Sequence, residues 1–192
     1  MRALPLLILL IAATAAAAES TAFHYPPIGW HFEIPSGWVR TTDEEIEAVR
    51  DRGSEVVTDV LGEPVDVSTL TPVLYLESPP QNSFTADVEG WDPAVDGDYA
   101  ENQQDVFDVV LASIDHIEVE YQHSYSNVAI DGIDFRVLEI EIMHPTTGEP
   151  FLKSRMFDAL LGEQSLAVSY SCTNAERCEE IHAAIVNSRF DR

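Results

Sequence analysis

Apolar and polar residues alternate along two neighbouring segments, residues 119–130 and 133–142, which are joined by Asp131-Gly132. This alternation is typical of half-buried strands, and Asp-Gly between two such runs is a strong signal for a two-residue hairpin turn. Counting outward from the turn predicts five cross-strand pairs: Ile130–Ile133, Val128–Phe135, Tyr125–Leu138, His123–Ile140 and Tyr121–Ile142.

The predicted hairpin changes its apolar face along its length. The apolar pairs near the turn lie on one face, and those farther away lie on the other. We therefore expect other elements to cover both faces of the hairpin, unless a bulge near Val137 and Leu138 changes the register.

The rest of the chain shows further strand and helix patterns. Strands are predicted at residues 31–34, 72–78, 83–91, 150–160 and 165–172, and helices at residues 42–61, 98–114 and 173–188. Consecutive strands joined by tight turns form a mainly antiparallel sheet, and helices must cover its apolar faces. The sequence thus predicts an α+β fold, a three-layer α/β/α sandwich with a mainly antiparallel sheet.

The first two of these helices begin with recognisable caps. Thr42 and Glu45 have capping-box spacing, and Asp98 is followed three residues later by Glu101. Gly62 and Pro64 end the first helix, and Gly53 is a position where it could bend or split. Apolar residues at helical intervals predict the buried positions Ile46, Val49, Val56, Val57 and Val60 in the first helix, and Val106, Phe107, Val110 and Ile114 in the second.

The N-terminus has the pattern of a cleavable secretory signal. Arg2 precedes a run of leucines and isoleucines, and small residues follow up to Ala18. This order of charged, apolar and small residues is typical of a signal peptide. We expect residues 1–18 to be removed, leaving residues 19–192 as a single domain without a membrane span, in the periplasm or secreted.

The chain is strongly acidic. Its formal net charge is −24, and Lys153 is its only lysine. Because nucleic acids and anionic membranes are bound largely through lysine and arginine, this charge argues against either as a partner. The acidity is compatible with a saline habitat, but charge that keeps an exported protein in solution is the simpler explanation.

The two cysteines lie at the end of the last long strand and in the last helix. Cys172 continues the apolar face of Leu166, Val168 and Tyr170. The helix that follows has Thr173 and Glu176 at capping-box spacing, and its apolar face carries Cys178, Ile181 and Ile185. Both thiols thus lie where strand and helix meet.

An exported chain favours oxidation of such a pair. Two thiolates without neighbouring ligands do not make a structural zinc site, and redox motifs usually have closer spacing. We therefore predict a structural disulfide between Cys172 and Cys178.

The order of the elements resembles a known superfamily. The chain has an extended F-x-I-P-S-G-W segment at residues 32–38, the strands TPVLYLE and SFTADVEGW, a helix, a hairpin around Ile-Asp-Gly and a terminal helix ending in NSRF. This arrangement is similar to the PsbP-like superfamily, which includes the lumenal PsbP subunit of photosystem II, a Ran-binding nuclear import factor and periplasmic DcrB-like proteins. The resemblance implies a compact domain that acts mostly through protein contacts, and it supplies no catalytic motif.

Candidate chemistry is sparse. The sequence has no G-x-S-x-G, P-loop, G-x-G-x-x-G or H-E-x-x-H motif. His123 is the best candidate for a general base, although a core histidine bound to a neighbour explains its mid-strand position more simply. Asp92, Asp96 and Glu101 offer oxygen ligands for calcium, without the spacing of an EF-hand; Asp98, beside them, is explained as a helix cap.

These observations favour an exported, non-enzymatic binding or accessory protein. Its predicted partner is another envelope or secreted protein, or a small ligand, and no cofactor is expected. Two alternatives remain open at this stage. One is a hydrolase that uses His123, and the other is an envelope protein that responds to calcium.

Overall fold

The computed structural model describes residues 20–64 and 67–191 of the chain, so the predicted signal peptide lies outside the described residues. The N-terminal elements are β1 (Thr21–Tyr25), the 3-10 turn η1 (Pro26–Ile28), β2 (Trp30–Ile34), β3 (Val39–Arg40) and α1 (Asp43–Leu61). The central elements are β4 (Thr71–Ser78), β5 (Asn82–Gly90), α2 (Pro93–Asp96) and α3 (Tyr99–His116). The C-terminal elements are β6 (Tyr121–Ile130), β7 (Ile133–Met143), β8 (Pro150–Leu161), β9 (Gln164–Cys172), α4 (Ala175–Val186) and β10 (Arg189–Phe190).

The strands form one large and one small sheet. The seven-stranded sheet has the order β3-β4-β5-β9-β8-β7-β6, and the three-stranded sheet has the order β1-β2-β10. All neighbouring strands in both sheets are antiparallel. The predicted α+β class with a mainly antiparallel sheet is therefore confirmed.

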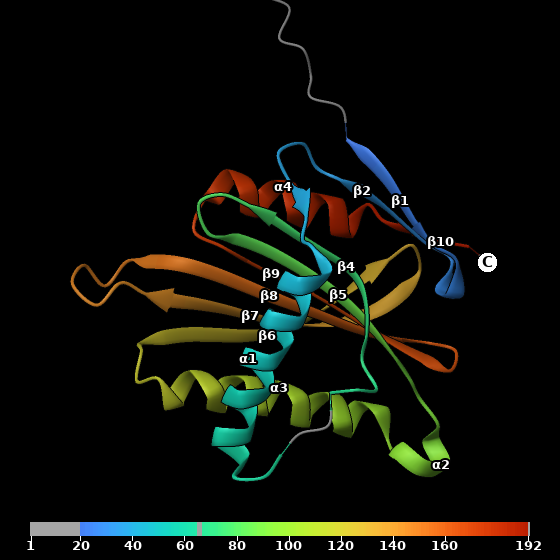
Figure 1. Ribbon diagram of the computed structural model, residues 1–192, viewed down its shortest axis with the longest axis horizontal. Helices are drawn as coiled ribbons and strands as arrows, with labels where there is room; N and C mark the ends of the chain where they lie inside the picture. The colour runs from blue at the N-terminus through green and yellow to red at the C-terminus, as the bar shows by residue number, and fades with distance from the viewer. Residues whose placement is uncertain (1–19, 65–66, 192) are drawn as a thin grey trace, which may run out of the picture.

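The large sheet is the middle of three layers (Figure 1). The helices α1 and α3 lie on one side of it, while α4 and the small sheet lie on the other. Each side has its own apolar cluster. One cluster contains Trp30, Phe32, Phe157 and Ile181, and the other centres on Phe107 of α3. Among the described residues, no helix is both long and apolar enough to cross a membrane.

The hairpin of β6 and β7 has the predicted register from Tyr121–Ile142 to Ile130–Ile133, with no shift along its length. Both faces of β7 are covered, because it contributes Phe135 and Val137 to one apolar cluster and Leu138 and Ile140 to the other, whereas most of β6, at the edge of the sheet, is exposed. The alternative of a bulge at Val137 and Leu138 is therefore not needed, and the change of apolar face reflects a strand buried on both sides.

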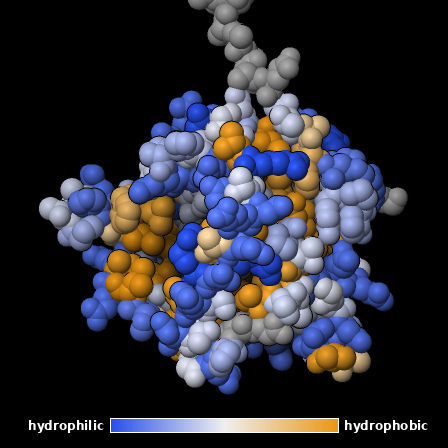
Figure 2. All heavy atoms as spheres, in the orientation of Figure 1, coloured by the Kyte–Doolittle hydropathy of each residue, from blue (hydrophilic) through white to orange (hydrophobic). Residues whose placement is uncertain are grey.

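The helix α1 has the predicted ends but not the predicted burial. Thr42 and Glu45 form the capping box, and Gly62 ends the helix in a left-handed conformation with φ 74°. The helix continues through Gly53 without a break. It contains no buried residue, so the predicted burial of its apolar residues is wrong, and Val49 and Val56 are more than 40% exposed. Figure 2 shows mostly hydrophilic side chains over this helix.

A side chain of α1 fixes the loop that follows this helix. The Arg50 guanidinium donates hydrogen bonds to the backbone carbonyls of Val67 and Leu70, at 2.5 and 2.9 Å. Hydrogen bonds to a charged donor are stronger than neutral ones. These contacts hold α1 in place where apolar packing is sparse.

The helix α3 begins at the predicted cap, since the Asp98 carboxylate accepts a hydrogen bond from the backbone N–H of Glu101 at 3.0 Å. Phe107 is completely buried, and Val110 and Ile114 are partly buried against the same cluster. The predicted burial of Val106 is wrong, because this residue is 37% exposed. Gln103 and Leu111 are buried on the sheet-facing side instead.

The short strands β1, β3 and β10 are not predicted by the sequence pattern. β10 has only two residues, too few to show alternation, and it pairs with β2 at Arg189–His31 and Phe190–Trp30. β1 pairs along its whole length with β2. Together they bring the last described residues beside the N-terminal strands.

The last helix is joined to the sheet by the predicted disulfide. Cys172 at the end of β9 and Cys178 in α4 are bonded, with their Cα atoms 5.7 Å apart. The predicted cap is wrong by one residue, since the side chain of Asn174, not of Thr173, accepts the hydrogen bond from the N–H of Arg177. Asparagine is an equally good cap, and the helix therefore begins one residue later.

Opening this disulfide should reduce the stability of the protein. Replacing both cysteines with alanine is expected to lower the free energy of unfolding by about 2 kcal/mol, because the unfolded chain regains the freedom of a short closed loop. Urea unfolding followed by circular dichroism measures the difference. As a control, a reductant should lower the melting temperature of the parent but not of the double variant; equal stability of parent and variant would contradict the prediction.

Candidate functional site

A pocket of about 310 Å³ lies between α4 and the strands β8 and β9, next to the disulfide. Its walls include Lys153 and Arg155 of β8, Tyr170 of β9 and His182 of α4. Lys153 and Arg155 are two positions apart in a strand, so both side chains point to the same face of the sheet. His182 lies one helical turn after Cys178, which the disulfide fixes beside β9.

Two glutamates of β7 neutralise the basic side chains of the pocket. Glu139 pairs with Lys153 at 3.0 Å and also with Arg155, and Glu141 pairs with Lys153 at 3.2 Å. Although burial acts to raise it, the pKa of Glu139 is lowered overall by the hydrogen bonds from Arg155 and Lys153. The pocket is thus close to neutral within a strongly acidic protein.

His182 is held in its neutral form. Burial first, and then the positive charge of Arg155, lowers the pKa of His182 below its usual range. The guanidinium Nη1 lies 3.1 Å from Nδ1 of the ring, which can accept a hydrogen bond from it. The ring also lies 5.9 Å from that of Phe157.

One polar atom of this site has no partner. The Nε of Arg155 is buried and has no hydrogen-bond acceptor within the described part of the chain. A buried donor without an acceptor costs about 1–3 kcal/mol. An acceptor brought by a ligand or by solvent would satisfy it.

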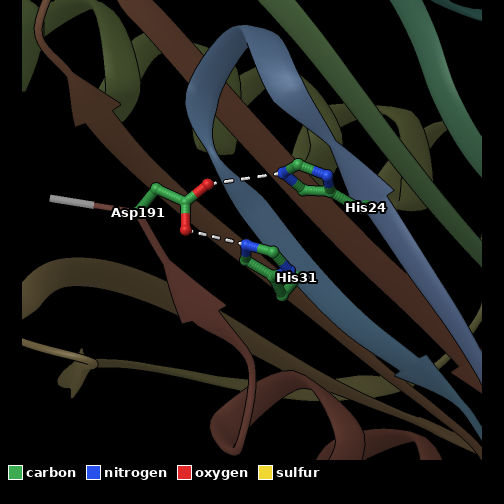
Figure 3. Close-up of side chains that lie close together, drawn as sticks. All are labelled: His24, His31 and Asp191. Carbon is green, nitrogen blue, oxygen red and sulfur yellow. Dashed lines mark hydrogen bonds and ion pairs between the residues drawn. The ribbon is translucent and has the colours of Figure 1, made fainter.

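A second group of candidate side chains lies where β1 and β2 meet the residue after β10. The Nε2 atoms of His24 in β1 and His31 in β2 both face the carboxylate of Asp191, which follows β10 (Figure 3). The possible ligand atoms of these three side chains lie within 4.8 Å of one another. Within the described residues, this is the cluster of histidine and acidic side chains close enough together to hold a metal ion.

The predicted general base, His123, is not in the core. It is exposed on β6, a strand at the edge of the large sheet. Its ring lies 5.9 Å from that of Tyr121 and 5.6 Å from that of Tyr125. The simpler interpretation of His123 as a core histidine is therefore wrong.

The predicted calcium ligands Asp92 and Asp96 make hydrogen bonds to the backbone of their own segment. The Asp92 carboxylate caps α2 by accepting a hydrogen bond from the N–H of Ala94 at 2.9 Å. Asp96 accepts one from the N–H of Asp92 at 2.7 Å. Asp92, Asp96 and Glu101 do not converge as a group of ligands in the described residues.

Two features of the sequence point to these sites, although neither feature belongs to a known motif. The only lysine and an arginine at positions 153 and 155 predict a basic strand face. His24 and His31 flank a Pro-Pro-Ile-Gly turn, so a hairpin there would place them opposite each other. Asp191 had no such signal, because its position depends on the pairing of β10 with β2.

A scan against protein-family models finds no match, and neither does a search of curated protein sequences. Solved structures do match the fold. The cyanobacterial PsbP protein, CyanoP, of Synechocystis superposes with a TM-score of 0.57 at 9% identity, over 93% of this chain and 96% of that protein.

Two further structures are similar. A protein of Bacteroides thetaiotaomicron matches with a TM-score of 0.50 at 12% identity over 91% of this chain, which spans 49% of that protein. The Ran-binding protein Mog1p of Saccharomyces cerevisiae matches with a TM-score of 0.40 at 9% identity, over 88% of this chain and 85% of that protein. At such low sequence identity these matches show a common fold only, and the evidence for that fold is the superposition on CyanoP. The chain therefore has the PsbP-like fold.

Proposed function

We propose that the mature protein, residues 19–192, is a single-domain, exported, non-enzymatic binding protein, and that the pocket beside the disulfide holds a small organic anion. We infer an anionic ligand from the buried Nε of Arg155, which has no hydrogen-bond acceptor among the described residues. A carboxylate is the natural acceptor for a guanidinium.

The composition of the pocket supports this ligand class. Lys153, Arg155 and the neutral His182 gather hydrogen-bond donors in a protein of net charge −24. Phe151, Leu152 and Tyr170 add apolar surface for the body of a ligand. The volume of about 310 Å³ is at the small end of ligand pockets.

The disulfide supports export, since such bonds persist mainly in oxidising compartments. The ligand would then be met in the periplasm or outside the cell, where another envelope or secreted protein is the expected partner. A binding role fits the PsbP-like fold better than hydrolysis by His123, because that ring contacts two tyrosines and shows no carboxylate partner in the described residues.

Thermal unfolding with a panel of small carboxylates, and with amines and alcohols of matched size, tests this function. A ligand present at a hundred times its Kd stabilises the native state by about 2.7 kcal/mol. We expect selected carboxylates to raise the melting temperature saturably, and matched amines to leave it unchanged.

Three variants locate the binding. Lys153→Gln should abolish the rise in melting temperature, and Arg155→Lys should weaken it, because lysine keeps the charge but lacks the Nε donor. Arg52→Gln, on the exposed face of α1, is the matched control and should behave like the parent. An equal rise in the Lys153→Gln variant would place the anion elsewhere. Ester hydrolysis lost in His123→Ala would favour the hydrolase instead.

A further inference from the structure

We propose that His24, His31 and Asp191 form a binding site for one divalent transition-metal ion, with Zn²⁺ as the probe. The site shares no lining residue with the pocket beside the disulfide, so it is independent of the proposed function. It joins the neighbouring strands β1 and β2 to the residue after β10, which is far from them in the sequence.

The backbone places the two histidines side by side. β1 and β2 are antiparallel, and His24 lies directly opposite His31 in their register. Side chains opposite each other on one face of an antiparallel pair are close neighbours. The two imidazole rings are stacked accordingly, with centroids 4.1 Å apart and planes 8° apart. Their edges therefore point in the same direction, toward Asp191 (Figure 3).

The backbone also fixes the carboxylate. The N–H of Asp191 donates a hydrogen bond to the carbonyl of Gly29 at 2.8 Å, one residue beyond the pairing of Phe190 with Trp30. Gly29 has φ 62°, and a Cβ built at this position would lie 2.6 Å from the Cβ of Asp191. Only glycine allows this approach without displacing Asp191.

The donor atoms already converge without a metal ion. The Nε2 of His31 lies 2.9 Å from Oδ1 of Asp191, and the Nε2 of His24 lies 3.4 Å from Oδ2. Ligands of a tetrahedral zinc ion, each about 2.0–2.1 Å from the metal, are about 3.3 Å apart. Small side-chain rotations would therefore suffice for the two rings and the carboxylate to bind one ion.

The donor set selects the class of metal. Two imidazole nitrogens with one carboxylate suit Zn²⁺, Cu²⁺ and Ni²⁺, whereas Ca²⁺ and Mg²⁺ prefer oxygen ligands alone. The net charge of −24 also raises the local concentration of cations. The ligands are partly exposed, with side-chain exposures of 43% for His24, 44% for His31 and 65% for Asp191.

The coordination would remain open on one side. A groove of about 730 Å³ passes His24 and His31 between the small sheet and α4, and Arg189 and Glu180 also line it. Three protein ligands with access to such a groove leave a position for water or for a donor from another molecule. The arrangement is that of an open site, not of a closed structural zinc site.

Isothermal titration of the untagged protein with Zn²⁺ tests the proposal. We expect one equivalent of Zn²⁺ to bind, and His24→Gln, His31→Gln and Asp191→Asn each to weaken binding at least tenfold. His123→Gln, an exposed histidine on β6, is the matched control and should bind like the parent. Affinity unchanged in the three ligand variants would overturn the assignment, as would equally tight binding of Ca²⁺ or Mg²⁺.

A spectroscopic measurement separates ligation from an effect on folding. Cu²⁺ bound to the parent should show hyperfine coupling to two imidazole nitrogens in electron paramagnetic resonance, and to one in His31→Gln. Circular dichroism of the metal-free variants should match the parent. Coupling to both imidazoles that persists in His31→Gln would contradict the proposed ligand set.

Discussion

Replacing Phe107 with alanine should lower the free energy of unfolding by about 3–5 kcal/mol, the range for a large aromatic side chain removed from a core. Phe107 has no exposed surface. It packs with Leu111, Leu138 and Ile140 between α3 and the sheet. The guanidinium of Arg136 also lies over its ring, 5.5 Å from the centroid.

The neighbouring residue provides a control on the same helix. Val106 is 37% exposed, so Val106→Ala should change the free energy of unfolding by no more than about 0.5 kcal/mol. Urea unfolding followed by circular dichroism compares both variants with the parent. Similar losses of stability in both variants would contradict the orientation of α3, in which Phe107 faces the sheet and Val106 is exposed.

Val106 also shows where prediction from helical spacing fails. Spacing identifies a band of apolar residues, and Phe107, Val110 and Ile114 in that band do face the sheet. It does not fix the edge of the band, and that edge depends on how the helix is rotated against its neighbours. Leu111, at the other edge, is buried instead.

The helix α1 shows the same limit more strongly. Its caps are local features, set by hydrogen bonds between residues three or four positions apart, and they were predictable from Thr42, Glu45 and Gly62. The burial of Val49 and Val56 depends on what covers the helix, and the structure leaves both exposed. Local signals thus fix where a helix begins and ends, and tertiary packing decides what it buries.

The hairpin could be predicted in full because its register is local. Asp131 and Gly132 supply the positive φ values of 49° and 81° that the two-residue turn requires. Every cross-strand pair then follows by counting from the turn. The disulfide followed similarly, from a strand and a helix adjacent in the sequence.

The candidate sites depend on contacts between distant segments. His31 and Asp191 are 160 positions apart, and they meet because the two-residue strand β10 joins the N-terminal hairpin. Arg155 and His182 meet across a sheet and a helix. No pattern within one segment specifies such meetings, so neither the approach of Asp191 to His31 nor that of His182 to Arg155 could be predicted from the sequence.

A half-buried carboxylate of the large sheet should make the protein more stable in mild acid. Burial, opposed by the hydrogen bond from Tyr75 and by the charge of Arg50, raises the pKa of Asp87 to about 6 from the usual 3.8. The Tyr75 hydroxyl lies 2.9 Å from Oδ1 of this carboxyl group. The pKa of Asp158, also buried, is raised by the same cause.

The sign of the effect follows from proton binding. Because the folded state holds the proton of Asp87 more tightly than the unfolded chain does, its contribution to stability is fully present below the usual pKa and is lost as the pH rises through about 6. Between pH 7 and pH 5 the free energy of unfolding should therefore increase by about 1.4 kcal/mol from Asp87. Asp158, whose pKa is also raised by burial, changes stability with pH in the same direction.

Asp87→Asn isolates the contribution of this one group. Asparagine keeps an oxygen that can accept the Tyr75 hydrogen bond but carries no charge, so the variant should be more stable than the parent at pH 7, by up to about 3 kcal/mol for the full shift in pKa. Between pH 7 and pH 5, the free energy of unfolding of the variant should also rise by about 1.4 kcal/mol less than that of the parent. Urea unfolding at both pH values measures the two effects, and Asp105→Asn, at an exposed position of α3, should show neither. A variant with the same pH dependence as the parent would mean that Asp87 is already ionised at pH 5 in the folded protein.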